Sequence, residues 1–294
     1  MSQSADYRSG KGHRDENFPV ASHLVSARHR PIIMAFYDFA RAADDIADHA
    51  TLTPDEKFVQ LDRLEASLTG TGADDPTGLR LRAALMDCNL PPRHALDLLK
   101  AFRQDVTKTR YADWDELIGY CTYSAMPVGR FVLDVHGEDV STWAASDVLC
   151  TVLQIINHTQ DCGKDYRNLD RVYIPQDMLA AAGATTAMLG AAYATPQLLN
   201  CLHRLTDRTQ VYFDASPSLA GEIKDTRLAC EVAAIDALAR KLLAILKQGD
   251  PLKDKVHLGK GAMLATMITA VAGTLVRRVG SGSTMQRGSQ GARP

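Results

Sequence analysis

The sequence predicts a single all-α domain, and three features of its patterning support this. Alternating runs of β-branched residues, which are typical of strands, are missing from the chain. Apolar residues instead recur at intervals of three and four residues, the spacing of one helix face. Clusters of proline, glycine and serine divide the chain into roughly eight to twelve expected helices. No internal repeat and no shift in composition marks a boundary between domains.

Several of the expected helices carry signals of their own, in order along the chain. The first has apolar residues at Ile32, Phe36, Phe39, Ala43 and Ile46. Pro54 opens the next, and the acidic residues 55–56 after it suit a first helical turn. Residues 113–116 give the same acidic signal further along the chain. A later amphipathic pattern follows Leu238, Leu242, Ile245 and Leu246.

The composition excludes several classes of protein. With 294 residues, 46% of them hydrophobic, the chain is long enough to bury a core and too apolar to be disordered. Its 33 basic and 35 acidic residues give a net charge of −2, which argues against a non-specific nucleic-acid binder. Six cysteines without a CxxC pair argue against a disulfide framework and a zinc site. The polar N-terminus lacks the apolar core of a secretory signal, so we expect a cytoplasmic protein.

The two ends of the chain are expected to lie outside the domain. Residues 1–16 are polar and are expected to be flexible, and the domain is expected to span residues 17–279. The uncharged run 261–276 is shorter than the roughly 20 strongly apolar residues of a membrane-spanning helix. We therefore expect it to form a buried terminal helix. Residues 280–294 have the composition of a linker and are expected to be disordered.

The first stretch whose side chains could form a functional site is residues 34–48. Asp44 and Asp48 are four residues apart, so on a helix their carboxylates lie on one face, about 6 Å apart. Arg41 precedes Asp44 by three residues and Tyr37 precedes Arg41 by four, which places both on the same stripe. Asp45 lies about 100° round the helix and is expected to support the others.

A second stretch, residues 154–166, repeats this arrangement. Gln154, Asn157, Asp161 and Asp165 fall at positions i, i+3, i+7 and i+11, which again form one helix face. The preceding residues 148–156 are largely apolar, so this helix is expected to be buried. Buried carboxylates are costly without a partner, and a metal ion is one remedy.

Each acidic pair by itself is most often a solvated helix face, and like charges at this spacing destabilise an isolated helix. Two such faces in otherwise apolar helices favour a metal site instead. Carboxylate and amide oxygens, without a cluster of His or Cys, suit Mg²⁺, whose remaining ligands are commonly substrate phosphates. The sequence therefore predicts a helical cavity in which two acidic faces bind a diphosphate through bridging Mg²⁺.

These residues resemble the motifs of the squalene/phytoene synthase family over residues 17–277. Residues 44–48 look like its first Asp-rich motif, and residues 161–165 look like its second. Residues 120–129 resemble its central helix beside the prenyl chains, and residues 171–175 resemble the stretch that closes the second site. The resemblance implies the isoprenoid synthase fold, a single helical bundle around a central cavity, and Mg²⁺-dependent chemistry on a prenyl diphosphate.

Departures from the common pattern narrow the resemblance to one branch. Gln160 stands where most members have Arg, and Met126 and Pro127 interrupt the usual small-residue run. These features resemble the bacterial hydroxysqualene synthases of the hopanoid pathway. That branch ionises presqualene diphosphate, rearranges the cation and adds water without a reductant.

Three alternative functions are compatible with parts of this pattern. A presqualene diphosphate or phytoene synthase, which condenses two allylic diphosphates head-to-head, would share the same metal site. A non-catalytic assembly factor of the same fold tends to lose Asp residues from the motifs, and both are intact here. A helical metal-dependent diphosphate hydrolase would usually add His ligands to the acidic faces.

The resemblance and the spacing together suggest roles for individual residues. The expected metal ligands are Asp44, Asp48, Asn157, Asp161 and Asp165. The residues expected to bind the substrate are Arg41, Gln154, Lys164 and Arg171, with Phe18, Val128, Gly129, Phe36, Leu133 and Leu153 as apolar walls. Tyr37 and Tyr173 are expected to act on the cation or the diphosphate, with the four motif aspartates as further catalytic residues. His158 and Gln160 are the candidates to orient the water.

The expected partners follow from this chemistry. We expect a prenyl diphosphate substrate such as presqualene diphosphate, no nucleic acid, peripheral contact with a membrane, and contact with pathway enzymes. No basic amphipathic anchor is evident in the sequence to carry the membrane contact.

Overall fold

The computed structural model describes residues 25–288, and the side chains of residues 25–280. This part of the chain is a bundle of α-helices with two short 3-10 helices and no strand, which confirms the predicted all-α domain. The expected flexible segment 1–16 lies outside the described residues. The α-helices are α1 (Arg30–Ala47), α2 (Pro54–Thr69), α3 (Pro76–Asp87), α4 (Arg93–Thr107), α5 (Trp114–Ser124), α6 (Met126–His136), α7 (Trp143–Leu169), α8 (Gln176–Ala181), α9 (Pro196–Asp214), α10 (Leu219–Glu222), α11 (Thr226–Leu246) and α12 (Lys260–Gly288).

Five of the described α-helices, α2, α3, α5, α9 and α11, begin at a polar side chain that accepts hydrogen bonds from the first backbone N–H groups. Thr53 caps α2, since its hydroxyl accepts a hydrogen bond from the backbone N–H of Glu56 at 3.3 Å. The Glu56 carboxylate in turn accepts from the backbone N–H of Thr53 at 2.8 Å, which completes a capping box. Asp113 caps α5 by accepting from the backbone N–H of Glu116 at 2.9 Å. Both predicted acidic first turns are confirmed.

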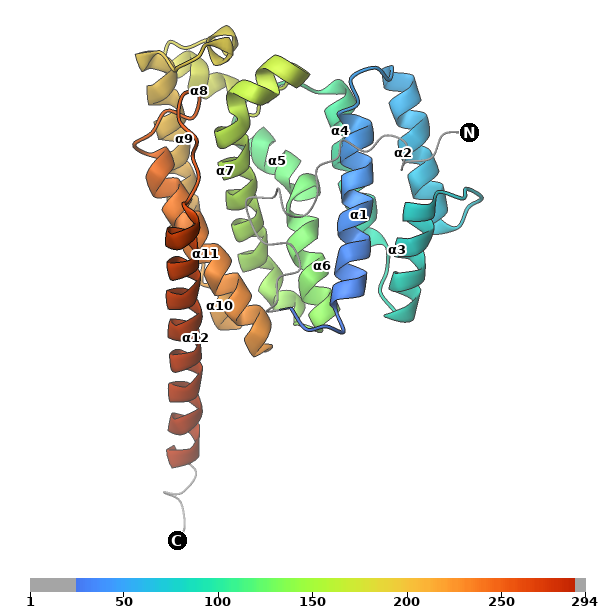
Figure 1. Cartoon of the computed structure of the whole chain (residues 1–294), viewed down its shortest axis with the longest axis vertical. Helices are drawn as coiled ribbons and strands as arrows, with labels where there is room; N and C mark the ends of the chain where they lie inside the picture. The colour runs from blue at the N-terminus through green and yellow to red at the C-terminus, as the bar shows by residue number, and fades with distance from the viewer. Residues whose placement is uncertain (1–24, 289–294) are drawn as a thin grey trace.

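The bundle has two sides, with α5 and α6 between them (Figure 1). On one side α1 to α4 bury residues such as Phe39 and Leu64 in a common apolar cluster. On the other side α7 and α11 bury residues such as Val152 and Leu242. A third cluster, which includes Leu205, joins α5, α7 and α9. The two helices that carry the acidic faces, α1 and α7, therefore belong to different sides of the bundle.

The predicted central helix over residues 120–129 is divided in two. The backbone breaks at Ala125, and α5 ends there while α6 begins at Met126. Pro127 lies in the first turn of α6, where its missing N–H costs nothing and its fixed φ suits a helix start. The two intruding residues thus start a new helix, which the family pattern alone did not reveal.

The C-terminal helix differs from the prediction in its exposure. α12 contains the uncharged run, yet Leu264 and Ile268 are each 60% exposed, so the expectation of a buried helix is wrong. The reason is that several of its large side chains share an outer face, whereas the buried Thr266 and Thr274 lie on the face toward the body. No proline interrupts residues 261–288, and the helix runs to Gly288, past residue 280 where the disordered tail was expected to begin. Residues 289–294 lie outside the described part of the chain.

One further property of α12 concerns its length and composition. Among the described helices, Lys260–Gly280 is the one long and apolar enough to cross a membrane by those two criteria. Its mean hydropathy is 1.3, and only 11% of that window is buried inside the structure.

Candidate active site

A cavity of about 1390 Å³ lies between α1, α4, α5 and α7. It is lined by the two acidic faces that the spacing predicted, which face one space from opposite sides. The residues concerned are Tyr37, Arg41, Asp44 and Asp48 from the first stretch, and Gln154, Asn157, Asp161, Lys164 and Asp165 from the second. Val128, Arg171 and Tyr173 also line it, and the loop 251–257 closes part of its wall.

The carboxylates of the first face are paired with arginine. Nη1 of Arg41 lies 2.7 Å from Oδ2 of Asp44, and its Nη2 lies 2.8 Å from Oδ1 of Asp45. Asp45 is buried, so it holds the guanidinium in place, which is the supporting position that the helical spacing predicted. Although about a third of the Asp44 side chain is accessible, it opens only onto the cavity. Burial in the surrounding protein and the charge of Asp48 raise the pKa of Asp44 to about 7.

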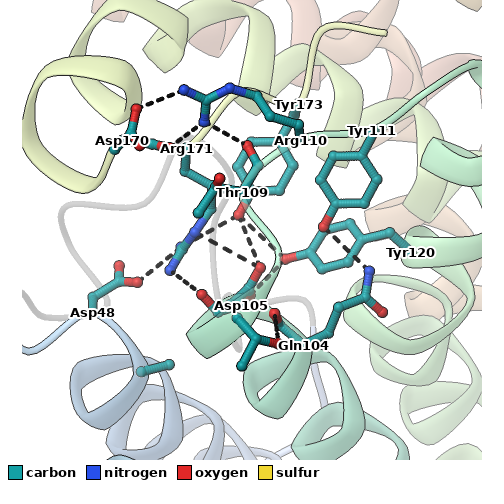
Figure 2. Close-up of polar contacts among 12 residues, drawn as sticks. Asp48, Gln104, Asp105, Thr109, Arg110, Tyr111, Tyr120, Asp170, Arg171 and Tyr173 are labelled. Carbon is teal, nitrogen blue, oxygen red and sulfur yellow. Dashed lines mark hydrogen bonds and ion pairs between the residues drawn. The ribbon is translucent and has the colours of Figure 1, made fainter. Parts of the chain in front are cut away.

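Arg171 ties the end of the first face to the opposite wall (Figure 2). It is only 6% exposed, and its Nη1 lies 2.9 Å from Oδ1 of Asp48. Its Nη2 donates to the backbone carbonyl of Asp105 at 3.1 Å, and its Nη1 donates to the hydroxyl of Tyr173 at 3.3 Å. Arg171 is therefore held in the cavity wall by contacts with two other segments of the chain and with Tyr173 of its own segment.

The second face has fewer positive partners. Nζ of Lys164 lies 3.9 Å from Oδ2 of Asp161, and both side chains are 40 to 50% exposed. Burial and the neighbouring charge of Asp161 raise the pKa of Asp165 to about 7. The carboxylates of Asp161 and Asp165 thus lie close together on this side of the cavity, where a cation would stabilise their ionised forms.

A third buried carboxylate, Asp105 of α4, was missed by the sequence analysis. Its Oδ2 accepts a hydrogen bond from Tyr120 at 2.8 Å and its Oδ1 accepts one from Tyr173 at 3.3 Å (Figure 2). Burial raises its pKa to about 6, against the opposing charge of Arg171. A signal existed, because Asp105 falls on the same helix face as the apolar Leu98 and Ala101.

His158 and Tyr173 form a stacked pair at the floor of the cavity. Their ring centroids lie 3.5 Å apart at an interplanar angle of 15°. Burial and the nearby Arg171 lower the pKa of His158 to about 3, so its ring is neutral. Its buried Nε2 has no hydrogen-bond partner among the described residues. The side chain of Gln160 makes a different contact: its amide donates to the backbone carbonyl of Val256 in the loop 251–257.

The apolar walls differ from the set predicted from sequence. Val128 lines the cavity, with Phe102 of α4 beside it. Gly129 does not: a Cβ there would lie 2.3 Å from Oγ of Ser146, so it is the contact point of α6 with α7. Phe36 and Leu133 are buried in the core clusters and Leu153 packs against one, because their positions fall on core-facing turns. Phe18 lies outside the described residues.

The donor set suits a metal that is shared with a ligand. Within residues 25–280, no three His, Cys, Asp or Glu side chains come close enough to hold a metal ion by themselves. The carboxylates form two separate sets instead, which matches Mg²⁺ held by one or two carboxylates and completed by phosphate oxygens. Burial, with a neighbouring carboxylate, raises the pKa of Asp44 and Asp165 to about 7, and a cation bound between the faces would favour their ionised forms.

Comparison with protein families gives one match that covers most of the chain. The model of the family described as squalene/phytoene synthase matches residues 12–262. A hydroxysqualene synthase of Rhodopseudomonas palustris is 55% identical over 95% of each chain. One of Zymomonas mobilis is 47% identical over 91% of each chain. A phytoene synthase of Pseudescherichia vulneris, which represents the alternative activity, is only 26% identical over 89% of this chain and 88% of its own.

Solved structures give the same picture of the fold. A squalene synthase from Alicyclobacillus acidocaldarius is 32% identical, with a TM-score of 0.70, over 83% of this chain and 92% of its own. A dehydrosqualene synthase superposes with a TM-score of 0.76 at 20% identity, over 92% of this chain and 95% of its own. The expected isoprenoid synthase fold and the expected family are both confirmed, and the names of the relatives agree with the expected branch.

Proposed function

Because the chain belongs to the squalene/phytoene synthase family, we propose that this enzyme of prenyl diphosphate chemistry is a hydroxysqualene synthase. Relatives at 47 to 55% identity over nearly the whole chain carry that name. The observation that carries the mechanism is the convergence of two acidic faces on one cavity. In the proposed reaction the C–O bond of presqualene diphosphate breaks and its electron pair leaves with the diphosphate. The cation rearranges, the oxygen of water bonds to carbon, and that oxygen loses a proton.

The diphosphate is proposed to lie between α1 and α7. Asp44, Asp48, Asn157, Asp161 and Asp165 would hold Mg²⁺, which when bound neutralises the negative charge that develops on the leaving diphosphate. Arg41 and Lys164 line the same space and would donate charge-assisted hydrogen bonds to its oxygens. Arg171 already contacts Asp48 and would keep that carboxylate oriented toward the site.

The rearranged cation is proposed to meet water beside His158. The buried aromatic side chains of Tyr120 and Tyr173 lie around His158 and line this part of the cavity, where aromatic rings can stabilise a nearby cation without reacting with it. A neutral His158 with a free Nε2 can accept a hydrogen bond from one water and so orient its oxygen toward carbon. Gln160 donates to the loop 251–257, which supports His158 rather than Gln160 in this role.

The test is a product assay of the purified full chain with Mg²⁺ and without NADPH. Presqualene diphosphate should give hydroxysqualene by mass spectrometry, and farnesyl diphosphate alone should give no product. Conversion of farnesyl diphosphate to presqualene diphosphate would instead assign the chain to the condensing branch. No turnover of either compound by a folded, Mg²⁺-loaded protein would contradict the proposal.

A further inference from the structure

The C-terminal helix α12 exposes a continuous apolar stripe. Leu264, Ile268, Leu275 and Val279 are 44 to 73% exposed. Their spacing of i, i+4, i+11 and i+15 places them within about 60° of one another on a helix of 100° per residue. The equally exposed Val276 lies at the edge of this stripe. Apolar side chains gathered in this way mark a surface that another molecule covers.

The opposite face of α12 packs on the body through the buried Thr266 and Thr274, with Met263 and Met267 half-buried beside them. Thr266 and Thr274 are buried, and their hydroxyls donate to the backbone carbonyls of Ala262 and Ala270 in the same helix at 2.6 and 2.9 Å. Because these hydroxyls are satisfied within the helix, the face can pack closely on the body. A terminal helix that packs on a globular body normally turns its large apolar residues inward, whereas α12 leaves the four residues of the stripe exposed.

Arg278 fixes α12 alongside the body, so that the stripe stays outward. Its guanidinium donates to the backbone carbonyls of Ala220, Ile223 and Lys224, and to the hydroxyl of Thr226 at 3.3 Å. These acceptors surround the start of α11, the helix on which α12 packs. The helix therefore lies against the protein, and Figure 1 shows only its C-terminal end extending past the neighbouring helices.

The charge distribution indicates what covers the stripe. Residues 1–254 contain 27 basic and 35 acidic residues, whereas residues 255–294 contain six basic residues and no acidic one. The six are Lys255, Lys260, Arg277, Arg278, Arg287 and Arg293. Exposed apolar side chains on a segment whose charged residues are all basic suit an anionic lipid surface, which attracts basic residues near it. Pairing two copies through α12 would instead bring like charges together.

We propose that α12 docks in the plane of an anionic membrane surface, with the stripe of Leu264, Ile268, Leu275 and Val279 inserted among the acyl chains. The loop 251–257, which lines the cavity, leads directly into α12, so docking brings the cavity wall next to the lipid. Exchange of long apolar substrate and product with the bilayer would follow, and this consequence rests on the proposed function. The lipid binding itself does not depend on it.

The test compares two double variants of the full chain in vesicle flotation. Ile268→Glu with Leu275→Glu puts charge on the stripe, and Val59→Glu with Met86→Glu makes the same kind of change at exposed apolar positions of α2 and α3. All four positions are exposed, so both variants should keep the helical circular dichroism spectrum. The wild type should float with phosphatidylcholine vesicles that contain phosphatidylglycerol. The stripe variant should bind at least about 100-fold more weakly, because two apolar side chains leave the lipid, and the control should bind as the wild type does.

A second readout locates the stripe. The fluorescence emission of the Ile268→Trp variant should shift to the blue when these vesicles are added, whereas that of the Val59→Trp variant should not. The proposal is overturned if the wild type does not bind, if the stripe variant binds like the control, or if vesicles without phosphatidylglycerol bind equally well. It is also overturned if light scattering shows that the wild type and the control are dimers and the stripe variant is a monomer, since a second copy would then cover the stripe. Turnover of presqualene diphosphate in detergent should be equal in both variants, and its absence would count against the proposed function alone.

Discussion

Replacing Arg171 should destabilise the fold far more than replacing a neighbouring surface arginine. Arg171 is buried, and its removal leaves the buried Asp105 and the partly exposed Asp48 without their cation. Breaking a buried pair by removing one partner costs about 3–5 kcal/mol. We expect the lower end, about 3 kcal/mol for Arg171→Met at neutral pH, because Asp48 is partly open to the cavity. Arg110→Met breaks a pair with the exposed Asp170 and should cost under about 1 kcal/mol.

The pH dependence of that loss follows from the pKa of Asp105. Burial raises this pKa from 3.8 to about 6 against the opposing effect of Arg171, so removing Arg171 raises it further. A carboxyl whose pKa is higher in the folded protein binds more protons there, so stability falls as the pH rises through this range. Below pH 3.8 Asp105 is protonated in both states, and its part of the loss disappears. The difference between variant and wild type should therefore be largest above pH 6.

Urea unfolding followed by circular dichroism across this pH range is the assay. Adding Asp105→Asn to the Arg171 variant should recover part of the lost stability, because no buried charge is then left unpaired at that position. Equal losses of unfolding free energy in the Arg171 and Arg110 variants would contradict this prediction. A loss in the Arg171 variant that does not change with pH would also contradict it.

Three further changes test other parts of the site. Asp161→Ala should lower turnover at least about 100-fold with an unchanged helical spectrum, because the Asp161 side chain is 40% exposed; near-normal turnover would remove it from the diphosphate site. His158→Phe should keep the ionisation step but shift the product from alcohol to hydrocarbon, measured as the product ratio by mass spectrometry; an unchanged ratio would exclude His158 as the residue that orients water. Gly129→Ala should cost about 1–3 kcal/mol in urea unfolding, because its Cβ would lie 2.3 Å from Ser146 and 2.5 Å from Cys150; a smaller loss in Gly129→Ala combined with Ser146→Gly would confirm that contact, and no loss in the single variant would contradict it.

The helical period was enough to predict the two acidic faces. Residues four apart on a helix share one face, whatever the helix packs against. This holds for Asp44 with Asp48 and for Asp161 with Asp165. Asp105 was missed because its partners Tyr120, Arg171 and Tyr173 come from other elements. No local spacing relates those four residues, so only the folded chain brings them together.

Two other errors have the same origin in tertiary packing. Gly129 follows a valine in a pattern that resembles a cavity wall, yet the break at Ala125 turns it toward α7. The run 261–276 is apolar on average, but an average does not reveal which face packs on the body. Thr266 and Thr274 are buried where α12 packs on α11, and Leu264, Ile268 and Leu275 are left exposed.

We propose that this chain ionises presqualene diphosphate in the cavity between α1 and α7 and ends the reaction with water. The most direct measurement is turnover of presqualene diphosphate in isotopically labelled water without NADPH, with the product analysed by mass spectrometry. We predict hydroxysqualene that carries one labelled oxygen, with more hydrocarbon and less labelled alcohol from the His158→Phe variant. An unlabelled alcohol, or a hydrocarbon as the main product of the wild type, would contradict the account.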